Sequence, residues 1–114
     1  MYYVYMLRCE DNSIYTGIAK DLERRMNEHF TQDEKCAKYT KSRKAKKLEI
    51  SWETENKSTA SKLEYAIKTL TKQQKEELIK EPNLLKEYFE DRLDKNNYNV
   101  VKREDTNCLF WKQK

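Results

Sequence analysis

Residues 2–29, YYVYMLRCEDNSIYTGIAKDLERRMNEH, contain the only glycine of the chain, Gly17, and its only histidine, His29. Residues 2–9 are aromatic and aliphatic without a helix or strand breaker, which predicts a β-strand. The next four residues, EDNS, favour a turn, and the five that follow, IYTGI, predict a second strand. The stretch therefore predicts a β-hairpin followed by a helix.

The register of this hairpin decides which tyrosines share a face. With a two-residue turn, Tyr5 and Tyr15 would lie on opposite faces, because side chains alternate along a strand. With a three-residue loop at 10–12, Tyr5 pairs with Gly17, and the two tyrosines become diagonal neighbours about 7–8 Å apart. Asn12 tolerates the left-handed backbone that such a loop needs. We therefore expect this loop, with Gly17 leaving room beside Tyr5.

The helix after the hairpin carries two polar residues on one face. Asp21 is a suitable N-cap, and apolar residues at helical spacing extend the predicted helix to Phe30. Arg25 and His29 are four residues apart and therefore lie one above the other. The spacing leaves two roles open for Arg25, which could cover apolar surface with its stem or reach into a cleft.

Later segments supply one further clear strand and three helices. Apolar residues alternate with polar ones at 48–54, which predicts a strand with one apolar face. A helix is predicted at 59–70 with Ser58 as its cap, and a shorter helix follows the cap Thr71. An amphipathic pattern predicts a last helix at 83–93, after the single proline, and a short strand can follow it.

Glu64 lies at the buried edge of the predicted helix 59–70, next to Leu63 and three residues before Ile67. A carboxylate in such a place is costly unless it is paired or bound to a cation. The pattern therefore leaves two interpretations open, a salt bridge to a nearby lysine or arginine and a metal site.

Residues 35–47, KCAKYTKSRKAKK, contain seven basic side chains and no acidic one. An aromatic ring and hydroxyl groups lie among these charges, a mixture that suits phosphate contacts and base stacking. A solvated loop would explain the charge equally well. The candidate nucleic-acid contacts in this segment are Lys38, Tyr39, Lys41, Arg43 and Lys44.

Composition narrows the class of protein. The 114 residues suit one hydrophobic core, and the net charge of +4 permits a polyanionic partner without requiring one. The three cysteines are scattered without CxxC spacing, which indicates free thiols in a reducing compartment. No segment approaches the ~18 apolar residues of a membrane span, and the N-terminus lacks the pattern of a secretion signal. We therefore expect a cytoplasmic protein without membrane association.

Several short motifs, taken in order, resemble the signatures of the GIY-YIG nuclease family. Residues 4–5 (VY) resemble the end of the first signature, and residues 15–17 (YTG) resemble the second. Residues 21–29 (DLERRMNEH) resemble the family's arginine helix, and residues 62–65 (KLEY) resemble the helix with its glutamate. Residues 37–40 (AKYT) further resemble the small single-domain bacterial branch.

The resemblance covers about residues 2–80 and implies an α+β fold, with a small three-stranded antiparallel sheet flanked by helices. Residues 1–80 would then form the nuclease domain, and residues 81–114 a C-terminal helical extension packed on or near it. Tyr3 stands where the first signature has glycine, and Thr16 where the second has isoleucine. We expect these departures to affect the access of a substrate to the site more than the cleavage reaction itself.

The same resemblance implies phosphodiester hydrolysis assisted by a single divalent ion, Mg²⁺ or Mn²⁺. The positions that match catalytic residues of the family are Tyr5, Tyr15, Arg25, His29 and Glu64, with Glu64 as the metal ligand. A metal ion and a guanidinium both stabilise charge that develops on a phosphate, and a hard ion that keeps several waters needs only one carboxylate. We favour Tyr15 over Tyr5 as the tyrosine that faces the attacking water.

The predicted function is therefore a metal-dependent endonuclease, for which DNA is favoured over RNA as the substrate and DNA repair or recombination is the expected process. Selectivity for structure rather than sequence is expected, because backbone contacts position a nucleic acid without specifying its bases. One alternative is a catalytically weak nucleic-acid-binding module that uses the basic segment. Another is an interaction protein that uses residues 83–111.

Overall fold

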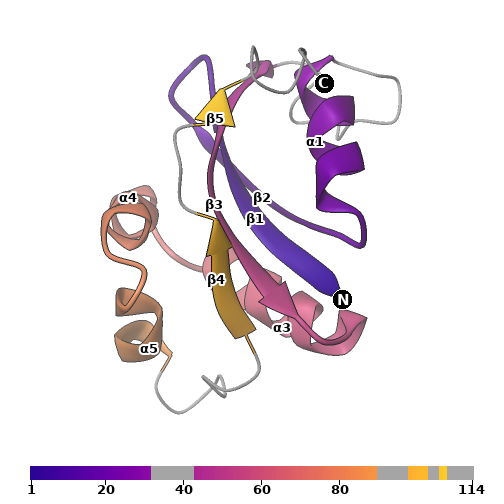
Figure 1. Ribbon diagram of the computed structural model, residues 1–114. Coiled ribbons are helices and arrows are strands. Elements are labelled where there is room, and N and C mark those ends of the chain that lie inside the picture. Colours follow the sequence, from indigo (N-terminus) through magenta and orange to yellow (C-terminus); the bar gives the residue numbers. More distant parts are fainter. Residues whose placement is uncertain (32–42, 90–97, 103–105, 108–114) are drawn as a thin grey trace.

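The computed structural model describes residues 1–31, 43–89, 98–102 and 106–107 (Figure 1). Along these residues the elements follow one another as β1 (Tyr2–Cys9), β2 (Ile14–Ala19), α1 (Leu22–Phe30), β3 (Ala45–Thr54), α3 (Lys57–Lys68), α4 (Lys72–Lys80), α5 (Leu84–Tyr88), β4 (Tyr98–Lys102) and β5 (Thr106–Asn107). The predicted fold class, an antiparallel sheet flanked by helices, is confirmed.

The sheet is larger than the predicted three strands. Its order is β2-β1-β3-β4, all neighbours are antiparallel, and β5 also pairs with β3 (Figure 1). Strand β3 is ten residues long, so its second edge can accept strands that come much later in the chain. The short strand expected after the last helix is confirmed at Tyr98–Lys102, but the description of residues 81–114 as a helical extension was incomplete, because β4 and β5 join the sheet. The division into domains at residue 80 stays a prediction.

The hairpin has the predicted register. Tyr5 pairs with Gly17 and Leu7 with Tyr15, which requires the three-residue loop. Asn12 has a φ of 69°, the left-handed conformation expected of it. Because paired residues share a face, Tyr5 and Tyr15 both point toward the side of the sheet that α1 covers.

The helix caps are partly as predicted. The side chain of Asp21 accepts a hydrogen bond from the Arg24 amide at 3.1 Å, and Thr71 begins a complete capping box. Helix α3, however, begins two residues earlier than expected, because the side chain of Asn56 rather than Ser58 caps it. Of the predicted helix 83–93 and the interaction segment 83–111, the structure describes only α5, β4 and β5, and the remaining residues lie outside the described part.

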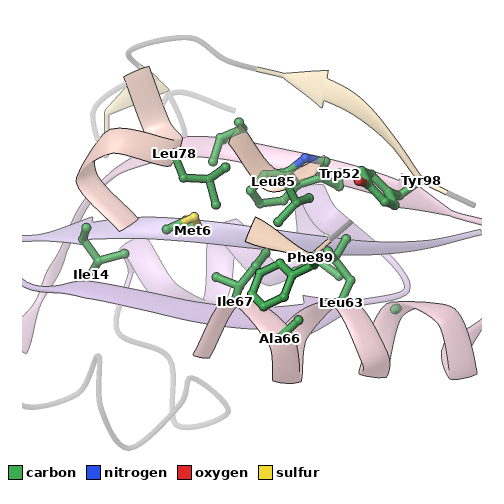
Figure 2. Packing of buried hydrophobic residues seen from close by; sticks show 13 residues of the cluster. Met6, Ile14, Trp52, Leu63, Ala66, Ile67, Leu78, Leu85, Phe89 and Tyr98 are labelled. Atoms are coloured by element: carbon green, nitrogen blue, oxygen red, sulfur yellow. The ribbon is translucent and has the colours of Figure 1, made fainter. Parts of the chain in front are cut away.

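Two hydrophobic clusters lie on opposite faces of the sheet. One cluster joins Tyr5 and Leu7 of β1 to Met26 and Phe30 of α1. The larger cluster joins the other side of β1 and β3 to α3, α4 and α5, and Figure 2 shows it around Met6. Burial of both clusters holds β1 between two helical layers, which fixes the position of Tyr5.

A β-bulge at Glu49 divides the apolar residues of β3 between the two faces. Met6 pairs with Ile50 while Leu7 pairs with Leu48, so Glu49 is an extra residue in β3. Leu48 consequently joins the α1 cluster, whereas Ile50 joins the opposite one. The expectation that residues 48, 50 and 52 form a single apolar face was therefore wrong at its first position.

A buried arginine connects this bulge to the hairpin loop and to α4. The Arg8 Nε donates to Glu49 Oε2 at 3.0 Å, and Nη1 donates to Glu76 Oε2 at 2.6 Å. The same Nη1 donates to the carbonyl of Asn12 at 3.2 Å. Because its charge is matched by two carboxylates, Arg8 can lie among buried residues and stabilise the hairpin that carries the tyrosines. Within the described residues, no helix combines the length and the hydrophobicity needed to cross a bilayer.

Candidate active site

Two tyrosines and the single histidine form a compact cluster between the hairpin and α1. The hydroxyl of Tyr5 lies 2.8 Å from His29 Nε2, and both side chains are fully buried. The ring of Tyr15 lies 6.2 Å from that of Tyr5 and 5.5 Å from that of His29, measured between centroids. Tyr15 is only partly buried, so it is the tyrosine of the pair that a ligand can reach.

Gly17 makes this arrangement possible. A Cβ atom added at residue 17 would lie 2.6 Å from the Tyr5 hydroxyl oxygen and 2.9 Å from Cε2 of Tyr15. The φ angle of Gly17 is not positive, so the backbone itself would accept another residue. Glycine is needed here because the two tyrosine side chains occupy the space that a Cβ atom would fill, and the room beside Tyr5 was predicted from the hairpin register.

Burial sets the charge state of the cluster. It lowers the pKa of His29 from 6.5 to about 3, with the neighbouring Arg25 charge acting in the same direction. Burial also raises the pKa of Tyr5 well above 10, and the nearby Tyr15 and Glu64 add to this shift while Arg25 opposes it. At neutral pH the pair is therefore a neutral imidazole and a neutral phenol. Such a pair can orient other groups by hydrogen bonding, but neither member carries a charge or exchanges a proton readily near pH 7.

Arg25 supplies the positive charge beside this cluster. Its side chain is 24% exposed, and Nη1 lies 2.9 Å from Oε1 of Glu28, one turn further along α1. Burial disfavours the charged form of Arg25, but Glu28 and Tyr5 outweigh burial and raise the pKa of Arg25 above its ordinary value. Of the two roles that the sequence left open, the structure places the guanidinium beside the tyrosine cluster rather than on apolar surface.

Glu64 belongs to α3, and its charge acts on the Tyr5 hydroxyl from there. The Glu64 side chain is 22% exposed, and its Oε2 lies 3.5 Å from Lys68 Nζ. The salt bridge that the sequence left open is therefore present. Lys68 is 50% exposed, and an ion pair of this kind contributes little free energy, so it leaves the carboxylate available to a metal ion.

The donor set suits only one kind of metal site. The described residues contain no group of three or more histidine, cysteine, aspartate or glutamate side chains that could enclose an ion. A partly exposed single carboxylate fits Mg²⁺ or Mn²⁺, because hard ions accept one protein oxygen and keep several waters. Among the residues described, Glu64 therefore fits the predicted ligand.

The predicted nucleic-acid contacts are only partly visible. Lys38, Tyr39 and Lys41 lie outside the described residues. Arg43 Nε lies 3.2 Å from Oδ2 of Asp11 in the hairpin loop. The exposed Lys44 lies beside the same loop, because its carbonyl accepts a hydrogen bond from Glu10 at 2.9 Å. Contact of these residues with nucleic acid stays a prediction.

A pocket next to Arg25 was not anticipated from the sequence. Its volume is about 280 Å³, and its walls come from the end of β2 and the first turns of α1. The residues that line it are Ala19, Lys20, Asp21, Arg24, Arg25 and Glu28. The basic residues Lys20 and Arg24, close in sequence to the helix arginine, were the signal that could have indicated it.

Comparison with known proteins identifies the family of the chain. The model of the GIY-YIG catalytic domain matches residues 1–77. A UPF0213 protein of Fusobacterium nucleatum is 50% identical over 82 residues, which cover 72% of this chain and 80% of that protein. A UPF0213 protein of Staphylococcus saprophyticus is 44% identical over 70% of this chain and 95% of its own length.

A solution NMR structure of a UPF0213 protein from Bacillus halodurans is similar as well. Its sequence is 40% identical, and the match covers 70% of this chain and 84% of that one, with a TM-score of 0.46. The family resemblance expected from the hairpin and helix motifs is confirmed by the match over residues 1–77. The chain therefore belongs to the GIY-YIG nuclease family and is related to the small bacterial UPF0213 proteins.

Proposed function

We propose that the protein is a metal-dependent endonuclease that hydrolyses phosphodiester bonds in DNA. One observation carries the proposal: the half-buried Tyr15 and the Arg25 guanidinium both lie next to the buried Tyr5–His29 pair, on one face of the sheet. A reachable hydroxyl beside a fixed cation suits attack of water on an anionic phosphate. Family membership supports the same class of reaction.

Arg25 is assigned to the phosphate. Its guanidinium stays protonated at any physiological pH and presents several N–H donors in a plane, so it can bind two phosphate oxygens at once. Glu28 holds one of its nitrogens at 2.9 Å and thereby restricts the conformations of the side chain. A cation positioned before the reaction stabilises the charge that develops on the phosphate at little further cost.

Tyr15 is assigned to the attacking water, because its ring is partly exposed whereas Tyr5 is fully buried. The rings of Tyr5 and His29 pack against Tyr15 and hold it in position. A histidine with a pKa of about 3 binds a proton too weakly to act as the general base near pH 7. We therefore assign His29 the role of fixing the orientation of the Tyr5 hydroxyl.

Glu64 would hold the single Mg²⁺ or Mn²⁺ ion. When bound, such an ion stabilises negative charge on the phosphate and lowers the pKa of a coordinated water. Selectivity for DNA structure, a role in repair or recombination, and a cytoplasmic location are parts of the same proposal. Membership of a nuclease family supports the class of substrate, and selectivity for structure is proposed because contacts to phosphates do not read bases.

Cleavage of defined DNA tests the proposal. Branched, single-stranded and duplex DNA would be incubated with the protein in Mg²⁺, in Mn²⁺ and in EDTA. Cleavage that depends on the ion, with a rate at least about a hundredfold lower for Arg25→Ala and Glu64→Gln, is the expected result. Glu81→Gln removes an equally charged but exposed carboxylate and serves as the control. Cleavage that persists unchanged in Glu64→Gln would overturn the proposal.

A nucleic-acid-binding module without turnover is the second candidate. The neutral state of His29 favours it, because an imidazole with a pKa of about 3 offers no general base near pH 7. In that case the wild-type protein would bind DNA with steep salt dependence but would not cleave it, and Glu64→Gln would bind equally well.

A further inference from the structure

We propose that Lys20 and Arg24 bind a second phosphate of the DNA strand whose scissile phosphate contacts Arg25. The binding site is the pocket between the end of β2 and the first turns of α1. This inference rests on the proposed function, because it takes Arg25 to be the contact of the scissile phosphate.

The pocket has a size that suits this ligand. Its volume of about 280 Å³ lies just below the range of roughly 300–1,000 Å³ typical of sites for drug-sized molecules. A phosphate with part of the adjoining sugar is smaller than such molecules. Asp21, which lines the pocket, uses its Oδ1 to cap α1 at the Arg24 amide, 3.1 Å away. The negative charge of Asp21, one of the two carboxylates that line the pocket, is therefore partly balanced by the positive end of the helix dipole.

Lys20 and Arg24, unlike Arg25, are not strongly bound by the protein itself. Glu28 is closest to Arg25, at 2.9 Å, and lies 3.7 Å from Arg24 Nε. The Arg24 side chain is 68% exposed, so this longer contact contributes little. Lys20 is exposed and forms no ion pair within the described part of the chain. Two flexible cations can therefore turn toward an anion without leaving a buried partner.

The location of Lys20 and Arg24 next to Arg25 indicates that the anion is another phosphate of the same DNA strand. Arg24 and Arg25 are neighbours in α1, and all three cations line one pocket. Along one strand of B-DNA the phosphates follow one another with a rise of about 3.4 Å. A strand held at Arg25 therefore brings its next phosphates to the pocket. This contact would add affinity and fix the direction of the strand, but it would not read its bases.

Binding measured without metal separates this inference from catalysis. Fluorescence anisotropy with a fluorescein-labelled forked DNA duplex in EDTA would compare wild type with Lys20→Gln/Arg24→Gln. Lys57→Gln/Lys86→Gln removes two exposed charges that do not line the pocket and is the matched control. We expect roughly tenfold weaker binding for the pocket variant, and a salt slope smaller by about 0.7–0.9 for each phosphate that the variant no longer binds. The control should change neither quantity as much.

A second arm uses DNA in which one phosphate next to the cleavage position is an uncharged methylphosphonate. Wild type should bind this DNA more weakly than unmodified DNA, whereas the pocket variant should bind both equally. Equal reductions of affinity in the pocket and control variants would overturn the inference, as would an equal effect of the modified phosphate on wild type and pocket variant. Circular dichroism checks folding, and the two single variants replace the double variant if it does not fold.

The two proposals fail in different ways. If wild type binds DNA through the pocket but does not cleave it in Mg²⁺ or Mn²⁺, the nuclease proposal fails and the phosphate site stands. If wild type cleaves DNA, and the pocket variant cleaves it with unchanged KM and unchanged affinity, the phosphate site fails and the nuclease proposal stands.

Discussion

The hydroxyl of Tyr5 and Nε2 of His29 lie 2.8 Å apart, and this hydrogen bond joins the central strand β1 to helix α1. Both groups are fully buried, so the hydrogen bond satisfies two polar atoms that water does not reach. The only histidine of the chain is therefore a neutral internal partner that fixes a tyrosine. The partly exposed Tyr15 packs against both rings, so its position depends on the same contact.

Replacing Gly17 with alanine tests how tightly the tyrosines pack on the hairpin. The added Cβ would lie 2.6 Å from the Tyr5 hydroxyl oxygen, in a core that cannot easily move. We expect a loss of about 1–3 kcal/mol in the free energy of unfolding, measured in urea, and a lower cleavage rate. The cost should shrink in a Tyr5→Leu background, because the obstructing ring is then absent. An equal cost in both backgrounds would contradict the steric explanation.

The depressed pKa of His29 predicts a pH dependence of stability. Burial lowers the pKa of His29 from 6.5 to about 3, so between these values the unfolded chain binds a proton that the folded chain does not. The stabilising contribution is complete above pH 6.5 and decreases as the pH falls. Between pH 7 and 4.5, wild type should lose roughly 2 kcal/mol more free energy of unfolding than His29→Gln. Urea denaturation of both proteins measures this, and parallel curves would contradict it.

Arg25→Lys distinguishes a planar phosphate contact from a simple positive charge. Lysine keeps the charge but offers no guanidinium plane for two phosphate oxygens, so cleavage should fall by roughly 10- to 100-fold. Glu28→Gln keeps the guanidinium and removes only the negative charge of the side chain next to it, so it should reduce cleavage less than Arg25→Lys. Single-turnover kinetics of the three proteins on one DNA substrate provide the comparison. Full activity of the lysine variant would exclude a bidentate contact.

Arg8→Ala should be among the most destabilising substitutions in this fold. The substitution removes the arginine partner of Glu49, whose side chain is only 8% exposed. It also removes the hydrogen-bond donor that lowers the pKa of Glu76. Glu49 then keeps only its contact with Lys47, 3.4 Å away, and the loss should approach the roughly 3–5 kcal/mol of a broken buried ion pair. Lys86→Ala, an exposed change of the same type, should cost much less. Urea denaturation near pH 7 measures both, and a loss below about 1 kcal/mol for Arg8→Ala would show that the network contributes little.

Local signals in the sequence were sufficient for much of the site. The three-residue loop, the left-handed Asn12 and the pairing of Tyr5 with Gly17 follow from alternation and turn chemistry within a short stretch. The cap at Asp21 likewise fixes the phase of α1 and thus the direction of Arg25. These features depend on residues close in sequence, which is why they could be predicted.

Features that join distant segments were missed or mistaken. The bulge at Glu49 was missed because it appears only when β3 pairs with β1, where Arg8 binds the Glu49 carboxylate. The pairing of β4 with β3 was missed because nothing local in residues 98–102 identifies its partner. The pocket beside Arg25 was missed although its lining residues all lie between positions 19 and 28, because a cavity depends on side-chain conformations that a sequence pattern does not give.

The sequence by itself determined the hairpin register, the caps of α1 and α4, and the family to which the chain belongs. The tertiary structure alone decided that His29 is neutral, that Tyr15 is reachable while Tyr5 is not, and that Lys20 and Arg24 share a pocket with Arg25. The physical reason is the range of the interactions. Turns, caps and alternation act between near neighbours in the chain, whereas burial and charge state depend on packing between segments that are far apart in the sequence. The pocket lies within one short segment, but its shape depends on side-chain conformations that only the folded chain fixes.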